Sequence, residues 1–392
     1  MTRTYRGALS GSAFLMAVSA IGPGFLTQTT QFTVELGASL AFAILVSILI
    51  DIGAQLNTWR AICVSGRRGD ELANAIFPGL GRVVIAVIVF GSFAFNIGNV
   101  SGCALALEAV FGLRNSFGAT ISAMLAILLF MSPRMGVALD RFSRSLGVVM
   151  IGLILYMVLK THPPVSRALL ESVAPEHVDF TAMVTLVGGT VGGYVMFSGA
   201  HRLLDAGIQG KDELKAITWA SVSGIIITGI MRSLLFLAVL GVLGLGAVVG
   251  ANTPVFDAFR SAAGTPGHFV SAIVFWSAAI SSVVGCSYTS ISFLKNKDEK
   301  MAARRTTTFI VLTLLAVYML QWTGFRPTPL LIAAGTFNGL LMPVVLGVAL
   351  LASYNRALMG GYRHPIWAGA IGLVAWLVSL YLAYRTIANL LM

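Results

Sequence analysis

Charged residues are scarce in this sequence, and their scarcity excludes an ordinary soluble protein. Asp, Glu, Lys and Arg together make up 10% of the 392 residues, whereas soluble domains carry roughly 25%. Hydrophobic residues make up 57% of the chain, and the mean hydropathy is +0.88. Apolar runs of about 20 residues, long enough to cross a bilayer, recur along the whole length. We therefore predict an all-α protein embedded in a membrane.

The motifs of several enzyme classes are also missing. There is no GxxxxGK[ST] loop, which excludes a nucleotide-driven pump in one chain, and no HExxH zinc motif. Ser198 does not fit a serine-hydrolase elbow, because Met196 stands where that turn needs glycine. Cys63, Cys103 and Cys286 lack CxxC spacing and neighbouring histidines, so we expect free cysteines packed as small apolar residues. The sequence predicts neither an enzyme nor a bound cofactor.

Eleven membrane-spanning helices are predicted from the apolar pattern, with no soluble domain between them. The segments are 9–33, 36–59, 83–111, 117–132, 145–160, 181–201, 216–248, 268–294, 307–324, 328–353 and 365–391. The apolar pattern continues directly after the first segment, so we expect a span there rather than a cleaved signal peptide. Residues 1–392 are accordingly predicted to form one integral membrane domain.

The positive charges are distributed unevenly between the predicted loops. With the N-terminus in the cytoplasm, nineteen Lys and Arg residues face the cytoplasm and six face outward, while Arg232 alone lies within a span. This asymmetry follows the positive-inside rule. We therefore predict a multi-pass protein of the cell (cytoplasmic) membrane, with a cytoplasmic N-terminus and an outer C-terminus. The net charge of +11 is explained by topology and does not indicate nucleic-acid binding.

Two of the predicted spans contain helix-breaking residues. A Gly-Pro-Gly sequence at 22–24 lies inside the first span, and a glycine-rich stretch at 188–193 lies inside the sixth. Proline lacks a backbone donor and glycine lowers helix propensity, so both helices are expected to break there. In a bilayer the freed backbone groups must meet protein, water or a ligand. Paired breaks of this kind are typical of secondary transporters with a central substrate site.

The two breaks also suggest an internal repeat. The proline-containing loop 161–180 divides the chain into spans one to five, about 9–160, and spans six to ten, about 181–353, with 365–391 appended. Because five is odd, the two halves would enter the membrane from opposite sides and form a 5+5 inverted repeat. The broken first and sixth spans then become symmetry mates. Close helix packing is the alternative explanation for glycines in spans, and we prefer it for Gly98 and Gly102.

Polar residues near the breaks are the candidate substrate site. In the first span these are Thr27, Gln28, Thr29 and Thr30, which we expect at the break itself. In the sixth span they are Met196, Ser198 and Gly199, with the helix expected to restart near Ser198. A restarting helix presents free N–H groups and its positive dipole end, which favour an anion such as a carboxylate. No metal ligands are assigned.

Four further residues are candidates for proton coupling or gating. Asp51 lies inside the second span and is either a proton carrier or a structural hydrogen-bonding group. His201 titrates at about pH 6.5 when unperturbed, so it is a second proton-coupling candidate, with a structural histidine as the alternative. Arg202 and Asp205, at i and i+3, are expected to form a gating or structural ion pair near the cytoplasmic end.

Other polar residues within the spans leave alternatives open. Arg232 in the seventh span needs a buried acidic partner, either Asp51 or Glu35. Asn96 and Asn99 in the third span are expected to hold helices together. Hydroxyl groups also recur along the eighth span. They belong to Ser281, Ser282, Ser287, Thr289 and Ser290. In sodium-coupled transporters that this arrangement of broken helices resembles, hydroxyls on the eighth helix help to hold Na⁺, and this resemblance keeps Na⁺ open as a coupling ion beside H⁺.

Several stretches resemble the Nramp family of proton-coupled divalent-metal transporters. They are Gly22-Pro23-Gly24-Phe25-Leu26, Gly37-Ala38-Ser39, Tyr194-Val195-Met196-Phe197-Ser198, Ala278 through Gly285, and Arg326-Pro327-Thr328 through Pro343. The resemblance covers most of the chain. It implies a LeuT-type fold in which broken helices 1 and 6 surround the substrate and the protein works by alternating access.

The chain departs from this family where the metal would bind. The family's Asp-Pro-Gly-Asn motif in the first helix has no counterpart here, and of its Met-Pro-His motif only Met196 remains, followed by Phe197 and Ser198. Neutral oxygens and one thioether would bind Mn²⁺ or Fe²⁺ weakly, because nothing offsets the cost of dehydrating the ion. A strongly hydrated ion such as Mg²⁺, kept partly hydrated, stays compatible with such a site.

Two stretches are similar to a bacterial subgroup of this family associated with 5-oxoproline metabolism. They are Gly22 through Gln28 and Ser198 through Asp205. The sequence thus predicts a secondary active transporter, a proton-coupled symporter of a compact carboxylic acid such as 5-oxoproline. The alternative is transport of a divalent metal ion, Mg²⁺, Mn²⁺ or Fe²⁺. The expected partners are this small solute or ion and the lipid bilayer.

Overall fold

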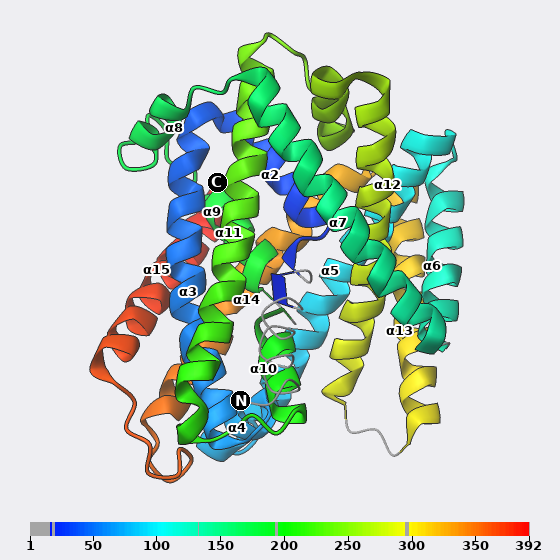
Figure 1. Cartoon of the computed structure of the whole chain (residues 1–392). Helices are drawn as coiled ribbons and strands as arrows, with labels where there is room; N and C mark the ends of the chain where they lie inside the picture. The colour runs from blue at the N-terminus through cyan, green and yellow to red at the C-terminus, as the bar shows by residue number, and fades with distance from the viewer. Residues whose placement is uncertain (1–15, 18–19, 132, 193–194, 295–297, 392) are drawn as a thin grey trace.

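The computed structural model describes residues 16–17, 20–131, 133–192, 195–294 and 298–391, which form helices joined by loops (Figure 1). No strand occurs within those ranges. The helices are, in chain order, α2 (Pro23–Leu36), η1 (Gly37–Ser39), α3 (Leu40–Ser65), α4 (Gly69–Ile76), α5 (Leu80–Phe111), α6 (Asn115–Met131), α7 (Pro133–Thr161), α8 (Val165–Glu171), α9 (Phe180–Val191), α10 (Val195–Asp205), η2 (Lys211–Glu213), α11 (Leu214–Gly244), α12 (Pro254–Ser292), α13 (Glu299–Trp322), α14 (Pro327–Tyr354) and α15 (Ile366–Leu391).

Membrane-spanning helices dominate the fold, as predicted. By length and apolar composition, 8 helical runs of the described residues could cross a membrane, or up to 9 if the bent pair α7–α8 counts as one span. One of these runs, Pro23–Ser65, joins α2 and α3, and α6 is a shorter apolar helix. The predicted number of eleven is therefore not confirmed by this count, although each predicted segment contains helix.

Both predicted helix breaks are present. Gly22 has an extended backbone (φ −104°, ψ −172°) and α2 begins directly after it at Pro23, a position where a missing N–H does no harm. α9 ends at Val191, Gly192 is again extended (φ −69°, ψ 158°), and α10 begins at Val195. Tyr194 lies outside the described residues. The helix of the sixth span thus restarts at Val195, three residues before Ser198, near which we had expected the restart.

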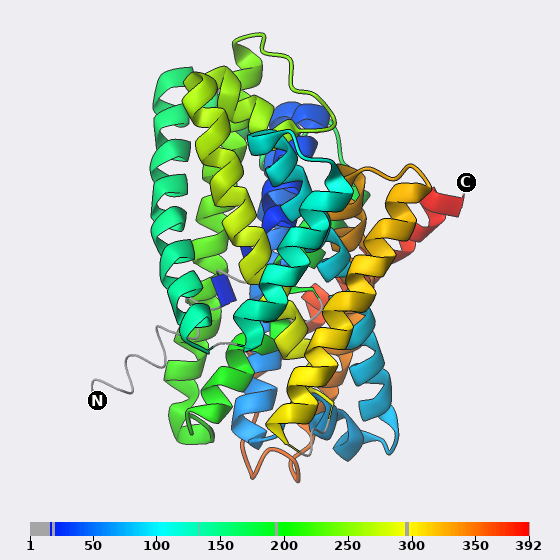
Figure 2. The ribbon, with the colours of Figure 1, turned by 90° about the vertical axis from the view of Figure 1, so that its right-hand side faces the viewer.

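The two broken spans run in opposite directions through the bundle. In Figure 1, α9 descends from the upper end, next to α8, and its continuation α10 lies in the lower half. α2 leads away from its own break into the upper half, while α3 and α11 extend along most of the bundle's height. Figure 2 shows the same long bundle from the side, with α12 and α13 beside the α6 layer. Opposed directions are what an inverted repeat requires.

A buried carboxylate anchors the upper end of the first two helices. Glu171 of α8 accepts hydrogen bonds from the Ser39 hydroxyl of η1 and from Nε of Arg167. Burial by itself would raise the pKa of Glu171, but these two hydrogen bonds lower it below its ordinary value. An ionised Glu171 therefore fastens the turn between α2 and α3 to α8.

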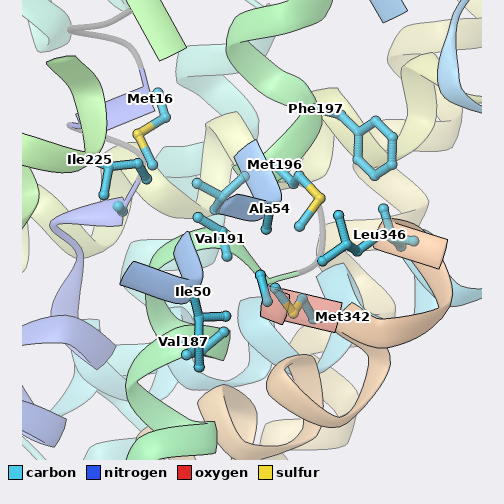
Figure 3. Close-up of a cluster of buried hydrophobic side chains, with 14 of the residues drawn as sticks. Met16, Ile50, Ala54, Val187, Val191, Met196, Phe197, Ile225, Met342 and Leu346 are labelled. Atoms are coloured by element: carbon cyan, nitrogen blue, oxygen red, sulfur yellow. The ribbon is translucent and has the colours of Figure 1, made fainter. Parts of the chain in front are cut away.

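Apolar side chains fill the centre of the bundle between the breaks. Figure 3 shows this cluster, to which the broken spans contribute Met16, Val191 and Met196, while Ala54 comes from α3 and Ile225 from α11. All five side chains are buried. Burial of this kind stabilises the packing of the half-helices against the long helices that flank them.

Glycines allow the helices around the sixth-span break to approach closely. A Cβ atom on Gly188 of α9 would lie 2.0 Å from the carbonyl oxygen of Gly335 and 2.2 Å from the nitrogen of Gly339, both on α14. On α5, a Cβ atom on Gly102 would lie 2.9 Å from Cβ of Pro23, which agrees with the packing role predicted for that residue. The glycine-rich stretch therefore serves packing as well as the break.

Candidate functional site

The polar residues of the first span lie inside α2 rather than at its break. Thr27, Gln28, Thr29 and Thr30 have helical backbones and side chains that are completely buried. The prediction that they sit at the break is wrong, because the helix resumes directly at Pro23. The Thr29 hydroxyl donates to the carbonyl oxygen of Phe25 at 2.8 Å, a bond within its own helix. The hydroxyls of Thr27 and Thr30 are buried without a hydrogen-bond partner.

Gln28 fixes α2 against two neighbouring helices. Its Nε2 donates to the carbonyl oxygen of Leu331 at 3.0 Å. A Cβ atom on Gly189 would lie 2.2 Å from Oε1 of Gln28, and one on Gly335 would lie 2.2 Å from its Nε2. The side chain is therefore held in a space that only glycine leaves open. Its Oε1 atom has no partner and stays a candidate contact for a substrate.

The first break faces polar groups from two other helices. A Cβ atom on Gly22 would lie 3.1 Å from Oγ of Ser282 on α12 and 4.0 Å from Oδ1 of Asn99 on α5. Asn99 is 1% exposed, and neither atom of its amide has a hydrogen-bond partner. Asn96, in contrast, donates to the hydroxyl of Ser287 at 3.1 Å, the helix-joining role predicted for both. Asn99 thus joins the candidate site. From the sequence we had expected it only to hold helices together.

The sixth-span candidates lie in the first turn of α10. Met196 points into the apolar cluster of Figure 3, and its sulfur accepts a hydrogen bond from the Thr58 hydroxyl at 3.4 Å. The Ser198 hydroxyl donates to the carbonyl oxygen of Val195 at 2.9 Å, and Gly199 is buried. Met196 is therefore placed as a packing residue. Within the described residues, no group of three or more His, Cys, Asp or Glu side chains is arranged to hold a metal ion.

A buried arginine lies next to both broken spans. Arg232 of α11 is 2% exposed, and its guanidinium stacks over the ring of Phe25, three residues after Gly22, at 4.4 Å. One NH1 group donates to the carbonyl oxygen of Leu186 on α9 at 3.0 Å. Its Nε and NH2 groups are buried without partners. The sequence had shown a buried charge in need of a partner, but not its position beside α2 and α9.

Asp51 is the carboxylate that acts on this arginine. It is 1% exposed on α3, and among the described residues Arg232 is the charged group whose field it feels, with the Thr190 hydroxyl as a hydrogen-bonding neighbour. The two side chains form no ion pair within 4.0 Å, and Oδ1 of Asp51 has no partner. Of the two partners considered for Arg232, the structure therefore favours Asp51 over Glu35.

His201 lies on α10 in an aromatic environment. Its ring centroid is 5.7 Å from that of Phe197 and 4.9 Å from that of Phe293. The side chain is 5% exposed, and neither ring nitrogen has a hydrogen-bond partner. The charged group acting on it is Arg68, so no counter-charge is placed beside this imidazole.

The predicted ion pair between Arg202 and Asp205 does not form. Instead, NH2 of Arg68 donates to Oδ1 of Asp205 at 2.8 Å, which links the start of α4 to the end of α10. Spacing along one helix indicated a partner within reach, but the turn before α4 brings a second arginine closer to Asp205. The Arg68–Asp205 pair is solvent-exposed, so its contribution to stability is about 1 kcal/mol or less.

The chain matches a known family over nearly its whole length. A family model described as natural resistance-associated macrophage protein-like, Nramp, matches residues 13–389. An uncharacterised membrane protein of Bacillus subtilis, YcsG, is 47% identical, with 97% of this chain and 94% of the relative covered. The divalent metal cation transporter MntH of Mycobacterium tuberculosis is 25% identical, with 97% and 92% covered.

Solved structures share the fold at low sequence identity. A manganese transporter from Eremococcus coleocola superposes with a TM-score of 0.73 at 16% identity, covering 99% of this chain and 88% of that one. MhsT in complex with L-phenylalanine superposes with a TM-score of 0.66 at 16% identity, covering 98% of each chain. The predicted fold class, an all-α LeuT-type membrane protein with broken helices 1 and 6, is confirmed.

Proposed function

The chain belongs to the Nramp family of membrane transporters, and we propose that it is a secondary active symporter whose cargo is a compact carboxylic acid. Members of this family are transporters and not enzymes, so the prediction of a multi-pass, non-enzymatic membrane protein is confirmed by membership. The residues around the breaks indicate the nature of the cargo.

The observation that carries the proposal is the sign of the charge beside the broken helices. Arg232 is buried there with two donor groups unpaired, whereas the described residues hold no cluster of metal-binding side chains. A guanidinium binds a carboxylate in a bidentate manner and repels a divalent cation. An anion therefore fits this position, and Mn²⁺ or Fe²⁺ does not.

The polar groups at the first break favour a cargo with an amide as well as a carboxylate. The amide of Asn99 offers a donor group and an acceptor oxygen, both without a partner, and it faces Gly22. Gly22 lies about one helical turn before Phe25, the ring on which the Arg232 guanidinium stacks. An amide side chain pairs with another amide through one donated and one accepted hydrogen bond. 5-Oxoproline carries both groups on one small ring, and it is the cargo we favour.

Divalent-metal transport is the second candidate, favoured by the comparisons. MntH of Mycobacterium tuberculosis is a divalent metal cation transporter by name, and the Eremococcus coleocola structure is that of a manganese transporter. For this chain, such a cargo would have to be held by neutral oxygens such as those of Thr27, Gln28 and Asn99. Mg²⁺ that keeps part of its water shell is the ion best suited to that arrangement.

We further infer that protons are the coupling ion and that Asp51 is the carrier, with His201 as a second candidate. Na⁺ is the alternative, since Ser282 lies beside the first break and its hydroxyl is a suitable oxygen ligand. The positive-inside distribution supports a cytoplasmic N-terminus, and the bacterial relatives support a bacterial cell membrane. The paired helix breaks support repeats at about 9–160 and 181–353, with 365–391 appended. Alternating access follows from the broken helices.

Uptake by proteoliposomes tests the proposal. Purified protein is reconstituted, and entry of labelled 5-oxoproline, Mn²⁺ and Mg²⁺ is followed with an inward proton gradient and without one. We expect gradient-driven accumulation of the organic acid and none of either metal. Accumulation of a metal without the acid would contradict the proposal.

Two variants make this test specific. Gln28→Ala and Ser198→Leu alter the two broken spans, and we expect each to abolish uptake while the amount of folded protein stays unchanged. Glu176→Gln is a matched control, because Glu176 is an exposed partner of Arg167 in the loop between α8 and α9, outside both broken helices. Unaltered uptake by either site variant would remove that residue from the site.

A further inference from the structure

Resting on the carboxylate cargo just proposed, we propose that Asp51 and the cargo carboxylate compete for Arg232, and that this exchange couples one proton to each cargo molecule. When the cargo carboxylate occupies the guanidinium, Asp51 loses its counter-charge and takes up a proton. When the cargo leaves, Asp51 again balances Arg232 and releases that proton.

Arg232 has the donors that such an exchange requires. A guanidinium carries five N–H donors in a planar fork, and Nη1 of Arg232 donates to the carbonyl oxygen of Leu186. Nε and NH2 are buried without partners. The ring of Phe25, at 4.4 Å, supports one face of the guanidinium, which keeps its edge available. The unpaired edge is where a carboxylate would bind.

Asp51 is placed near enough to act on Arg232 but does not occupy its donors. Each is the charged group that acts on the other, yet no oxygen of Asp51 lies within the 4.0 Å of an ion pair. Oδ1 of Asp51 is buried without a partner. A permanent structural ion pair would close this distance and satisfy both groups. Because the two side chains do not contact each other, Asp51 leaves the Nε and Nη2 donors of Arg232 unoccupied.

The elements packed against α3 bring no other counter-charge to Asp51. α11 contributes Arg232 and α9 contributes the Thr190 hydroxyl. α10 also packs against α3, but the charged group acting on its His201 is Arg68. Charged groups also lie on other elements that contact α3, but none of them acts on Asp51. They are Glu35 of α2, Asp70 and Glu71 of α4, Arg167 and Glu171 of α8, and Arg385 of α15, while η1 and α14 carry no charged side chain. Its protonation is therefore governed by whether Arg232 is available.

The exchange balances charge and protons at each step. Without cargo, one negative Asp51 balances one positive Arg232. With cargo, the cargo carboxylate balances Arg232 and Asp51 is neutral after accepting a proton from the water on the side where the cargo entered. Release on the other side returns the proton there. One proton and one carboxylate thus cross together, and no net charge is moved.

The variant Asp51→Asn separates cargo binding from proton coupling. Asparagine keeps the shape of the side chain but cannot take up a proton. We expect this variant to exchange external labelled for internal unlabelled 5-oxoproline at a rate within about 3-fold of the unaltered protein. We also expect it to lose proton-driven accumulation and the internal acidification that a pH-sensitive dye reports. Proton-driven accumulation by Asp51→Asn would overturn the proposal.

A measurement on the unaltered protein keeps the proposal testable if Asp51→Asn does not fold. A membrane potential set with K⁺ and valinomycin should leave 5-oxoproline uptake unchanged at a fixed proton gradient, because no net charge moves. Uptake that rises with an inside-negative or an inside-positive potential would overturn the coupling scheme. Those outcomes leave the carboxylate cargo intact, whereas absence of any 5-oxoproline exchange alongside metal uptake would contradict the proposed function itself.

Discussion

Arg232 and His201 are both buried inside the helix bundle, and each has two side-chain nitrogen atoms without a hydrogen-bond partner. Their surroundings differ in charge. Arg232 stacks on Phe25 and has the carboxylate of Asp51 in its neighbourhood. His201 lies between two phenyl rings, and the charged group acting on it is a second cation, Arg68.

This difference separates a group that can exchange partners from one that cannot. A buried cation with a nearby but non-contacting carboxylate can bind a second anion, provided that the first carboxylate becomes neutral by taking up a proton. An imidazole with no counter-charge beside it has no such exchange available. His201 is therefore better placed to pack the end of α10 than to carry protons, and the carrier we propose is Asp51.

The largest effect is expected from removing the cation. Arg232→Gln should weaken 5-oxoproline uptake by about 100-fold, since losing one partner of a buried charge pair costs about 3 kcal/mol. The matched control is Arg385→Gln, because Arg385 also stacks on an aromatic ring, that of Phe180 at 4.6 Å, but lies away from the breaks. Initial uptake rates of both variants, normalised to reconstituted protein, provide the comparison. Equal loss in the two variants would contradict a specific role for Arg232.

A smaller effect is expected from replacing Phe25, the aromatic ring on which the Arg232 guanidinium stacks. Phe25→Leu keeps an apolar side chain but removes the aromatic face, which is worth about 2 kcal/mol at a buried site. We expect roughly 30-fold weaker uptake. Phe293→Leu makes the same change beside His201 and should leave the apparent affinity unaltered. An equal shift of KM in both variants would show that the two regions do not differ.

A still smaller effect is expected at the histidine itself. His201→Phe cannot titrate, and its ring suits the space between Phe197 and Phe293. Uptake should stay within about 3-fold of the unaltered protein, because no hydrogen bond is lost, and its dependence on external pH should not change. Uptake by His201→Phe measured over a range of external pH tests whether His201 carries the coupled proton. Loss of proton-driven accumulation in this variant would indicate that it does.

The smallest effect concerns a histidine outside the spans. His364 hydrogen-bonds through Nε2 to Oδ1 of Asn57 at 2.8 Å, and burial together with nearby Arg60 lowers its pKa to about 4. Because the unfolded chain binds this proton at about pH 6.5, the contribution of His364 to stability is present above that pH and is lost as the pH falls towards 4. The melting temperature should fall by about 2 °C over this interval. His364→Gln should flatten this part of the profile, and an unchanged profile would assign the effect to other groups.

The sequence was informative about the breaks because their causes are local. Pro23 and the glycines at 188–193 act through their own backbones, so the positions of both interruptions could be predicted from residue type. Membrane insertion and family membership likewise follow from features spread along the whole chain. The placement of Thr27 to Thr30 at the break was wrong because a proline in the first turn begins a helix as readily as it ends one.

The candidate site was harder to predict because it depends on which helix faces meet. Arg232 and Phe25 are far apart in sequence, and nothing along α11 indicates that its arginine stacks on α2. The spacing of Arg202 and Asp205 indicated an ion pair, but Arg68 from the turn before α4 is the partner. Contacts between segments that are far apart in the sequence, such as Arg232–Phe25 and Arg68–Asp205, determine which charged groups lie at the site and which do not.

Equilibrium binding of labelled 5-oxoproline to the purified protein in detergent tests the central claim most directly. The measurement is made with the unaltered protein and with Arg232→Gln, in the presence and absence of Mn²⁺. We predict saturable binding that Mn²⁺ does not displace and that Arg232→Gln loses. Mn²⁺ binding that persists in Arg232→Gln, with no binding of the acid to either protein, would contradict the account.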